Sequence, residues 1–513
     1  MTQAATAGAA SSKTLHTFTN TPDGAQPTST LVAGPDGFLY GTTSDGGAFG
    51  GGTVYRTDLK GAVTVLHSFS SADRSDTGVG HAPVGRLLLA SDGRLYGTTS
   101  SGGDWDDCPG YGQCGSLFSL EPDGDGFRME HRFSGGDTDG AKAMAGVIEG
   151  SDGRLYGTTQ YGGEDDRGTQ YSGRGTVYAL DRTTDQLTIL HTFSGEDGQF
   201  PLAELVEGSP GQFYGTTSMH ILTGTGRGSV FGVTAAGVFS FIHTFRYITG
   251  ATPVAPVIIS QRDGRLYGTT RDGGQHGMGV IFAVTPTSPG AYEVIHEFGA
   301  EGATGIDPVA GLLEAPDGMM YGTATGGGLP QGDYTSGVLL QLAPSGRVGV
   351  LKTFYDGADG RWPQAGVTFG SNGRLYGTAR GGGAGMGVLY RYRVDAVATL
   401  ARVSAYPTEV TGGDTGYSAP KGVVILDGRA PVGGATVTLR SSRPGVLSVP
   451  ASVKVSKNWS EAFFPIVTRA VSSTKVVECR GTATLTANGT ATLSLMADRR
   501  LASPGMIGGG SPG

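Results

Sequence analysis

One phrase recurs seven times along the chain and constrains the fold more than any other feature. The phrase is Asp-Gly-x-Leu-Tyr-Gly-Thr-Thr or a close variant, and its tyrosines are Tyr40, Tyr96, Tyr156, Tyr214, Tyr267, Tyr321 and Tyr376. Successive tyrosines lie 56, 60, 58, 53, 54 and 55 residues apart. A proline precedes the tyrosine by 13 or 14 residues in six copies, and Ala143 replaces it in the other. Such self-similarity predicts a repeat architecture of seven equivalent units.

Each unit contains four short alternating segments. The first runs from the proline to the Asp-Gly, as in residues 201–208, and the second is the Leu-Tyr-Gly-Thr-Thr segment itself. The third resembles Thr-Val-Tyr-Ala-Leu, and the fourth ends in Leu-His-Thr-Phe. Asp-Gly between two such runs predicts a tight hairpin with positive φ at both turn residues. Four antiparallel strands repeated radially are typical of a propeller blade.

The two ends of the repeat region complement each other. A Leu-His-Thr-Phe segment stands at residues 15–18, before the first complete repeat, whereas the seventh repeat stops after its third segment. Left apart, both would expose unpaired strand edges. We therefore predict a seven-bladed β-propeller in which the N-terminal strand completes the last blade.

Composition agrees with an all-β fold. The chain has 92 glycines in 513 residues and only 16% charged residues, so long helices are disfavoured. It contains no apolar run near the roughly 18 residues that a membrane span needs. A net charge of −8 argues against a nucleic-acid partner. Residues 1–13 lack the apolar core of an export signal.

The repeated phrase GRLYGTT…GG…GTVY…LHTF resembles the Gloeo-Verruco (GloVer) tandem repeat of bacterial secreted and surface proteins. The resemblance covers about residues 13–394, with seven matching copies. It implies a β-propeller and an extracellular or cell-surface location. The family carries no agreed catalytic residues, so the resemblance assigns none here.

A second region follows the repeats. About seven short alternating segments lie between residues 397 and 498, which predicts an immunoglobulin-like sandwich similar to modules of bacterial surface proteins. We therefore expect four parts: a disordered N-terminus (1–12), the propeller (13–396), the Ig-like domain (397–498) and a disordered tail (499–513).

The loops between the second and third strands vary most and are the expected location of a ligand site. They are longest in blades two and three, at about 16 residues each. Aromatic rings beside carboxylates and arginines are typical of sugar recognition. The candidate ligand-binding residues on this face are Asp104, Trp105, Tyr111, Tyr161, Tyr334, Arg361 and Trp362.

Two further features of these loops concern metal binding and cysteine chemistry. Clustered carboxylates at Asp104, Asp106 and Asp107 could bind Ca²⁺ through hard oxygen ligands, although no cofactor is required. Cys108 and Cys114 are close enough to form a loop-closing disulfide.

Catalysis by the same face is the alternative to binding. A polysaccharide lyase needs a tyrosine or histidine base, with arginine to neutralise a uronate, whereas a glycosidase needs two carboxylates at defined separation. The candidates are Tyr161, Tyr171, His220, His276, Arg167, Arg174, Arg361, Asp104, Asp106, Glu164 and Asp166. The sequence does not decide between enzyme and binding protein.

Two positions of the repeat need separate interpretation. Six histidines share one position of the outermost strand: His16, His67, His131, His191, His243 and His296. Strands of separate blades lie too far apart to share an ion, so we expect these histidines to pack between blades. In the first strand, Arg86 and Glu204 place charges where the other five blades are neutral. We expect either a salt bridge between blades or a site at the mouth of the central channel.

These observations predict an extracytoplasmic propeller that recognises a glycan or protein through its variable-loop face, most strongly around blades two and three. The alternatives are a polysaccharide lyase or glycoside hydrolase and a purely structural surface repeat protein. We expect a monomer whose partner is a polysaccharide or a surface protein.

Overall fold

The computed structural model describes most of the repeat region and parts of the region that follows. In the first region the described residues are 12–71, 80–103, 114–136, 139–163, 173–220, 227–299, 304–316, 318–328, 337–355, 357–383 and 385–394. In the second they are 400–406, 409–411, 421–426, 435–441, 444, 447–455, 461–468, 475–476, 479–485, 495–497 and 500–502. The larger compact unit comprises Lys13–Val348 and Thr353–Tyr392, and the smaller consists mainly of Arg393–Gly513.

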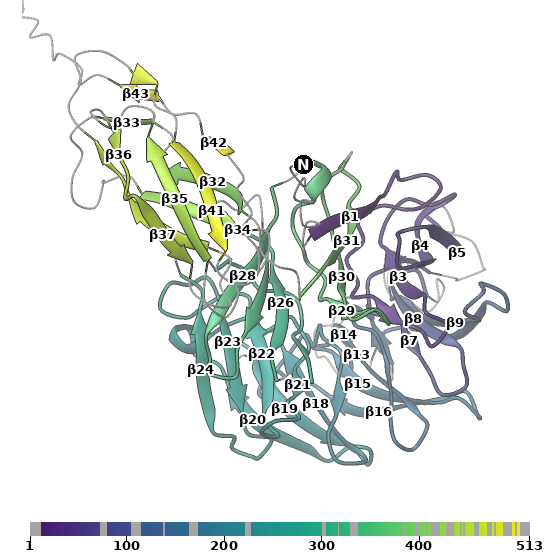
Figure 1. The fold of residues 1–513 in the computed structure, drawn as a ribbon. Helices are drawn as coiled ribbons and strands as arrows, with labels where there is room; N and C mark the ends of the chain where they lie inside the picture. The colour runs from purple at the N-terminus through teal and green to yellow at the C-terminus, as the bar shows by residue number, and fades with distance from the viewer. Residues whose placement is uncertain are drawn as a thin grey trace, which may run out of the picture. The chain divides into compact units, whose positions relative to one another are not determined.

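The larger unit is a seven-bladed β-propeller, as predicted (Figure 1). Blade one contains β2 (Val32–Ala33), β3 (Leu39–Thr43), β4 (Gly50–Thr57) and β5 (Val63–Ser70). Blade two contains β7 (Leu88–Leu89), β8 (Leu95–Ser101), β9 (Ser116–Leu120) and β10 (Arg128–Arg132), with β6 (His81–Pro83) also paired to β8. Blade three contains β12 (Ile148–Glu149), β13 (Leu155–Thr159), β15 (Thr176–Asp181) and β16 (Gln186–Thr192), beside the pair β11 (Gly140–Ala141) and β14 (Tyr161–Gly162).

The remaining blades have the same order, from the innermost strand outward. Blade four contains β17 (Val206–Glu207), β18 (Gln212–Thr217), β19 (Ser229–Thr234) and β20 (Phe239–Thr244). Blade five contains β21 (Ile258–Ile259), β22 (Leu266–Thr270), β23 (Val280–Val284) and β24 (Tyr292–Glu297). Blade six contains β25 (Leu313–Glu314), β26 (Met320–Ala324), β27 (Val338–Leu342) and β28 (Val348–Thr353). Blade seven contains β29 (Thr368–Phe369), β30 (Leu375–Ala379) and β31 (Val388–Tyr392). Two short 3₁₀ turns, η1 (Tyr247–Thr249) and η2 (Gly357–Asp359), lie in the connections.

The N-terminal strand β1 (Ser12–Thr17) is the fourth strand of blade seven, which confirms the predicted closure. Figure 1 shows this purple strand beside the green β31. The Phe18 N–H donates to the Gly387 carbonyl at 3.0 Å. Five other blades make the equivalent bond: Phe133 to Gly115, Phe193 to Gly175, Phe245 to Gly228, Phe298 to Gly279 and Phe354 to Gly337. The ring is therefore closed by the same contacts that complete an ordinary blade.

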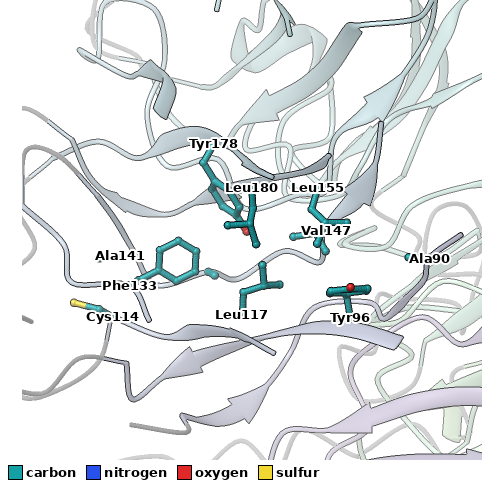
Figure 2. Packing of buried hydrophobic residues seen from close by; sticks show 11 residues of the cluster. Ala90, Tyr96, Cys114, Leu117, Phe133, Ala141, Val147, Leu155, Tyr178 and Leu180 are labelled. Atoms are coloured by element: carbon teal, nitrogen blue, oxygen red, sulfur yellow. The ribbon is translucent and has the colours of Figure 1, made fainter. Parts of the chain in front are cut away.

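Apolar clusters between neighbouring blades form the core. The Leu or Val of each first strand is buried between blades, as are the large residues of the Tyr-containing second strand. Figure 2 shows the cluster between blades two and three, in which side chains from both blades meet: Tyr96, Leu117, Phe133, Val147, Leu155, Tyr178 and Leu180. The cluster that spans the closure contains Phe18, Leu31, Leu39, Tyr55, Tyr376 and Leu389. Burial of each such side chain contributes about 1.5–3 kcal/mol.

The turn between the first two strands differs from the expectation. In the Asp36-Gly37 pair of the first blade only Gly37 has a positive φ (85°), and its N–H donates to the Gly34 carbonyl at 3.1 Å. Asp36 instead accepts a hydrogen bond from the Tyr40 hydroxyl at 2.5 Å. The same Asp–Tyr bond recurs in blades two, three and five. The two residues of the Asp-Gly pair thus have different roles: the glycine adopts the positive φ, and the aspartate side chain accepts a hydrogen bond. Two positive φ values are not needed.

The smaller unit consists of short β-strands. One sheet contains β32 (Leu400–Tyr406), β34 (Lys421–Leu426) and β38 (Glu461–Pro465), and another contains β37 (Ser452–Val455), β35 (Ala435–Ser441), β41 (Cys479–Leu485) and β42 (Leu495–Ala497). The others are β33 (Glu409–Thr411) with β43 (Arg500–Ala502) and β40 (Lys475–Val476), and β36 (Leu447–Ser448) with β39 (Val467–Thr468). Strand β43 falls within the segment expected to be a disordered tail. The Ig-like assignment stays a prediction.

Candidate functional site

A ring of left-handed backbone conformations marks one face of the propeller. In every repeat, one residue lies directly before the recurring proline, or before Ala143 where the proline is replaced. This residue has φ between 54° and 61° in all seven blades: Gln26, Ala82, Lys142, Phe200, Thr252, Asp307 and Trp362. This conformation costs a non-glycine residue roughly 1–2 kcal/mol, whereas glycine adopts it freely. A chain with 92 glycines places none at these seven positions. We call this set the left-handed ring.

Hydrogen bonds to the variable loops hold the ring. The Phe200 N–H donates to the Arg174 carbonyl of the preceding blade at 2.7 Å, and the Phe200 carbonyl accepts from the Ser218 N–H at 3.1 Å. Equivalent N–H bonds join Gln26 to Met386, Lys142 to Cys114, Thr252 to Arg227 and Asp307 to Met278. The end of each of these loops is therefore fixed beside the ring residue of the next blade, and both belong to one face.

Two groups of side chains on this face include residues that the sequence predicted. On blades three and four, the Tyr161 ring meets the Phe200 ring edge-on, with centroids 5.4 Å apart, and the Lys142 ammonium lies 5.9 Å from the Tyr161 centroid. On blade seven, the Arg361 guanidinium lies 4.1 Å above the Trp362 ring. The sequence-predicted Tyr161 and the predicted pair Arg361–Trp362 thus lie in separate clusters. Lys142 and Phe200 were missed, although they occupy the same repeat position as Trp362.

Charged groups complete the face. Burial raises the pKa of Asp307, the nearby Asp272 raises it further, and Arg271 opposes both. Arg380 donates to the Gln26 side-chain oxygen at 2.8 Å. Arg174, a candidate from blade three, donates to the Ser194 carbonyl. Both signs of charge therefore occur on the described part of this face, beside the aromatic rings of Tyr161, Phe200 and Trp362.

His220 and His276 lie outside the repeated histidine position, and they differ in solvent exposure. His220 is buried, its ring meets Phe241 edge-on at 5.5 Å, and burial lowers its pKa. His276 lies in the loop before β23 of blade five. Among the contacts of the described residues, none joins His220 to His276.

Several predicted residues lie outside the described residues. These are Asp104, Trp105, Asp106, Asp107, Cys108, Tyr111, Glu164, Asp166, Arg167, Tyr171 and Tyr334. Their roles, including calcium binding, stay predictions. Cys114 is disulfide-bonded, and its predicted pairing with Cys108 stays a prediction. Among the residues that the structure describes, no group of three or more His, Cys, Asp or Glu could hold a metal ion.

The outer-strand histidines have structural partners. His16, His131 and His191 lie 2.7, 3.2 and 2.9 Å from carboxylate oxygens of Asp23, Asp139 and Asp197, respectively. His67 stacks on Phe127 at 4.0 Å and His243 on Tyr292 at 3.9 Å, each ring belonging to the next blade. Asp23, Asp139 and Asp197 each precede a glycine, so an Asp-Gly pair supplies the partner of His16, His131 and His191.

The innermost strands enclose an axial cavity of about 500 Å³. A first layer, nearest the left-handed ring, is apolar in five consecutive blades: Val84, Met144, Leu202, Val254 and Val309. The next layer, two residues further along each strand, contains Arg86, Glu204 and the neutral residues Thr30, Gly146, Pro256, Gly311 and Gly366. In blades one and seven the first layer holds Thr28 and Gln364, so the apolar collar covers five of the seven blades, above a layer with two opposite charges.

Arg86 and Glu204 form the pair expected between blades, and they do so inside the cavity wall. Their closest nitrogen and oxygen atoms are 3.8 Å apart, and the side chains are 46% and 14% exposed. Burial raises the pKa of Glu204, and Arg86 opposes this rise. The two predicted alternatives, an inter-blade salt bridge and a channel site, are therefore compatible with one arrangement.

The fold and this face define a seven-bladed propeller with one structured, chemically varied surface around an axial cavity. The model of the Gloeobacter/Verrucomicrobia repeat matches residues 3–226, 110–329 and 220–428, and the chain belongs to this family. Comparison with curated proteins finds no significant match. No helix in the described part of the chain is long and apolar enough to cross a bilayer.

Several solved structures resemble the chain at low identity and with TM-scores below 0.5. The extracellular domain of a protein described as a hybrid two-component system of B. thetaiotaomicron is 11% identical, with a TM-score of 0.47, over 96% of this chain and 57% of that one. A Thermus protein described as an oxidoreductase (glucose dehydrogenase) is 15% identical, with a TM-score of 0.37, over 74% and 98%. An ulvan lyase is 9% identical, with a TM-score of 0.42, over 73% and 93%. The chain thus spans little more than half of the first of these proteins, and likenesses at these scores carry no functional argument.

Proposed function

We propose that this protein recognises a glycan, without transforming it, through the face that carries the left-handed ring. The observation that carries the proposal is the ring itself. Seven positions share one backbone conformation that glycine would adopt at lower cost, yet each carries a different side chain. A rigid scaffold that presents varied side chains is what ligand recognition requires.

The chemistry of the ring favours a saccharide. Pyranose faces are apolar and pack on aromatic rings such as those of Tyr161, Phe200 and Trp362, while their hydroxyls pair with charged groups. Lys142 and Arg361 lie beside two of these rings. Clusters on blades three, four and seven would contact separate residues of one oligosaccharide, so we propose a polymeric ligand, a polysaccharide.

Such a ligand places the protein outside the cytoplasm, at the cell surface or in the medium. The disulfide bond of Cys114 supports this proposal, because disulfides persist mainly in oxidising compartments.

A glycan array probed with the full chain, with and without Ca²⁺, tests the proposal. We expect saturable binding of an oligosaccharide that Tyr161→Ala and Trp362→Ala each weaken by about tenfold or more, which corresponds to roughly 1.4 kcal/mol. Val238→Ala is the matched control, because Val238 is 64% exposed in the turn between strands three and four on the opposite face.

Two results would contradict the proposal. Unchanged binding in both aromatic variants would place the site elsewhere. Release of ultraviolet-absorbing unsaturated products from uronate polysaccharides would show a lyase in place of a recognition protein, and new reducing ends without such products would show a glycosidase.

A further inference from the structure

The axial cavity has the size and lining of a small-molecule site, distinct from the loop face. Its volume of about 500 Å³ lies within the range of roughly 300–1,000 Å³ that such sites occupy. Ligand sites combine a mostly apolar wall with a few polar groups that fix orientation. The apolar collar and the layer with Arg86 and Glu204 provide these two components.

Arg86 is the most exposed of the charged groups that line the cavity. Among the described residues that line the cavity, it is the one cation, and 46% of its side chain is exposed. Its 3.8 Å separation from Glu204 is too long for a hydrogen bond, so the planar set of guanidinium donors is not saturated by this contact.

The three acids of the lining are less available. Glu204 is only 14% exposed. Glu149 accepts from the Ser91 N–H at 2.7 Å and also binds Arg182. Glu207 accepts from the N–H and hydroxyl of Ser151 at 2.9 and 2.8 Å. Each of the last two is held by the turn of the preceding blade, so Arg86 is the charged group of the lining that is best placed to pair with a ligand.

Gly146 makes the cross-blade pair possible. It lies in blade three, between the blades of Arg86 and Glu204, and an added Cβ would stand 2.2 Å from the Arg86 carbonyl and 2.9 Å from Glu204 Oε1. A side chain at this position would therefore displace the charged layer.

The distance between the two layers sets the ligand's length. Val84 and Arg86 are two residues apart on one extended segment, a separation of roughly 7 Å. A carboxylate bound by the guanidinium fork would thus place a chain of about five carbons against the collar. We propose that the axial cavity binds a small organic carboxylate with a short apolar tail, its carboxylate on Arg86 and its tail among Val84, Met144, Leu202, Val254 and Val309.

Titration of the full chain with hexanoate, followed by calorimetry, tests this site. We expect saturable binding at one site, with hexanamide and hexylammonium each at least about tenfold weaker, because neither supplies the anion that Arg86 pairs with. Arg86→Gln should weaken hexanoate binding by about tenfold or more. Glu204→Gln should strengthen it several-fold, because it removes the competing carboxylate and keeps the shape of the side chain.

Controls separate binding from folding. Val238→Ala, on the outer surface, should leave hexanoate affinity unchanged, and melting of each variant shows whether it folds. If Arg86→Gln fails to fold, the comparison of hexanoate with hexanamide and the Glu204→Gln variant still decide. Equal affinity for hexanoate and hexanamide, preference for hexylammonium, lack of hexanoate binding by the wild type, or unchanged affinity in a folded Arg86→Gln variant would each overturn the proposal.

Discussion

The Thr98 hydroxyl donates a hydrogen bond to the Ala145 carbonyl at 2.8 Å, joining the second strand of blade two to the first strand of blade three. Four other pairs of neighbouring blades make the same bond, with donors Thr158, Thr216, Thr269 and Thr323. The two seams that flank blade one differ. Thr42 bonds to Ser29 within its own blade, and Thr378 Oγ1 is buried with no hydrogen-bond partner among the described residues. The seven seams are therefore not equivalent.

This difference predicts opposite effects for one substitution in adjacent blades. Thr323→Val should lower the free energy of unfolding by about 1–2 kcal/mol, because it leaves the buried Ala365 carbonyl without this donor. Thr378→Val should leave stability unchanged or raise it by up to about 1 kcal/mol, because it removes an unsatisfied buried hydroxyl. Denaturant melts of the two variants check this. Equal losses in both would contradict the described seams.

Removal of β1 should open the ring. Deletion of residues 1–18 removes the fourth strand of blade seven and the fully buried Phe18, so we expect a large fall in melting temperature or aggregation through the exposed edge of β31. Phe18→Ala alone should cost about 3–5 kcal/mol. Deletion of residues 1–11, which keeps β1, is the control. Identical melting of the two truncated chains would rule out closure by this strand.

Partly buried histidines should make stability depend on pH below neutrality. Burial lowers the pKa of His67, His243 and His296 to about 4 in the folded state, against about 6.5 in an unfolded chain. The unfolded state then binds more protons between these values, so stability is full above pH 6.5 and falls as the pH drops toward 4. Urea melts between pH 4 and 7 should show this slope.

Substitution of a single histidine should remove part of the dependence of the unfolding free energy on pH. His67→Phe and His243→Phe keep an aromatic ring for stacking on Phe127 and Tyr292 but remove the titrating group. Each should remove a share of the pH dependence, of the order of 1–3 kcal/mol. A slope that persists unchanged in the double variant would assign the dependence to other groups.

The left-handed ring should be strained. Thr252→Gly should raise the free energy of unfolding by about 0.5–1 kcal/mol, since glycine relieves the cost of positive φ and loses part of that gain through its own flexibility. Thr252→Ala keeps a Cβ and should show a smaller gain. Thermal melts of both variants distinguish relief of strain from simple removal of a side chain. Greater stabilisation by alanine than by glycine would be inconsistent with a strained ring.

Much of the fold could be predicted because it is repeated. Seven copies of Leu-Tyr-Gly-Thr-Thr average out the ambiguity of any single short strand, and the spare Leu-His-Thr-Phe segment identified the closure. The turn was less predictable. The sequence pattern was interpreted through the backbone conformation of Asp36 alone, whereas its carboxylate accepts a hydrogen bond from the Tyr40 hydroxyl four residues away.

The candidate site was harder to predict than the fold. Trp362 was chosen for its aromatic ring, whereas Phe200 and Lys142 at the same repeat position were not, because positive φ at a residue other than glycine leaves no trace in composition. The Arg86–Glu204 pair was anticipated because charge near a narrow axis is costly unless it is paired. Its location inside a cavity depends on how wide the ring of seven first strands is, which no single strand reveals.

The uniform geometry of the left-handed ring has a consequence for how such proteins diversify. Because the backbone at all seven positions is alike, a side chain on one blade could be exchanged with that on another without inserting or deleting residues. Binding preference could then change through point mutation or unequal recombination among repeats, with the circular order of seven side chains as the variable. Libraries randomised at these positions alone would sample that diversity on an unaltered scaffold.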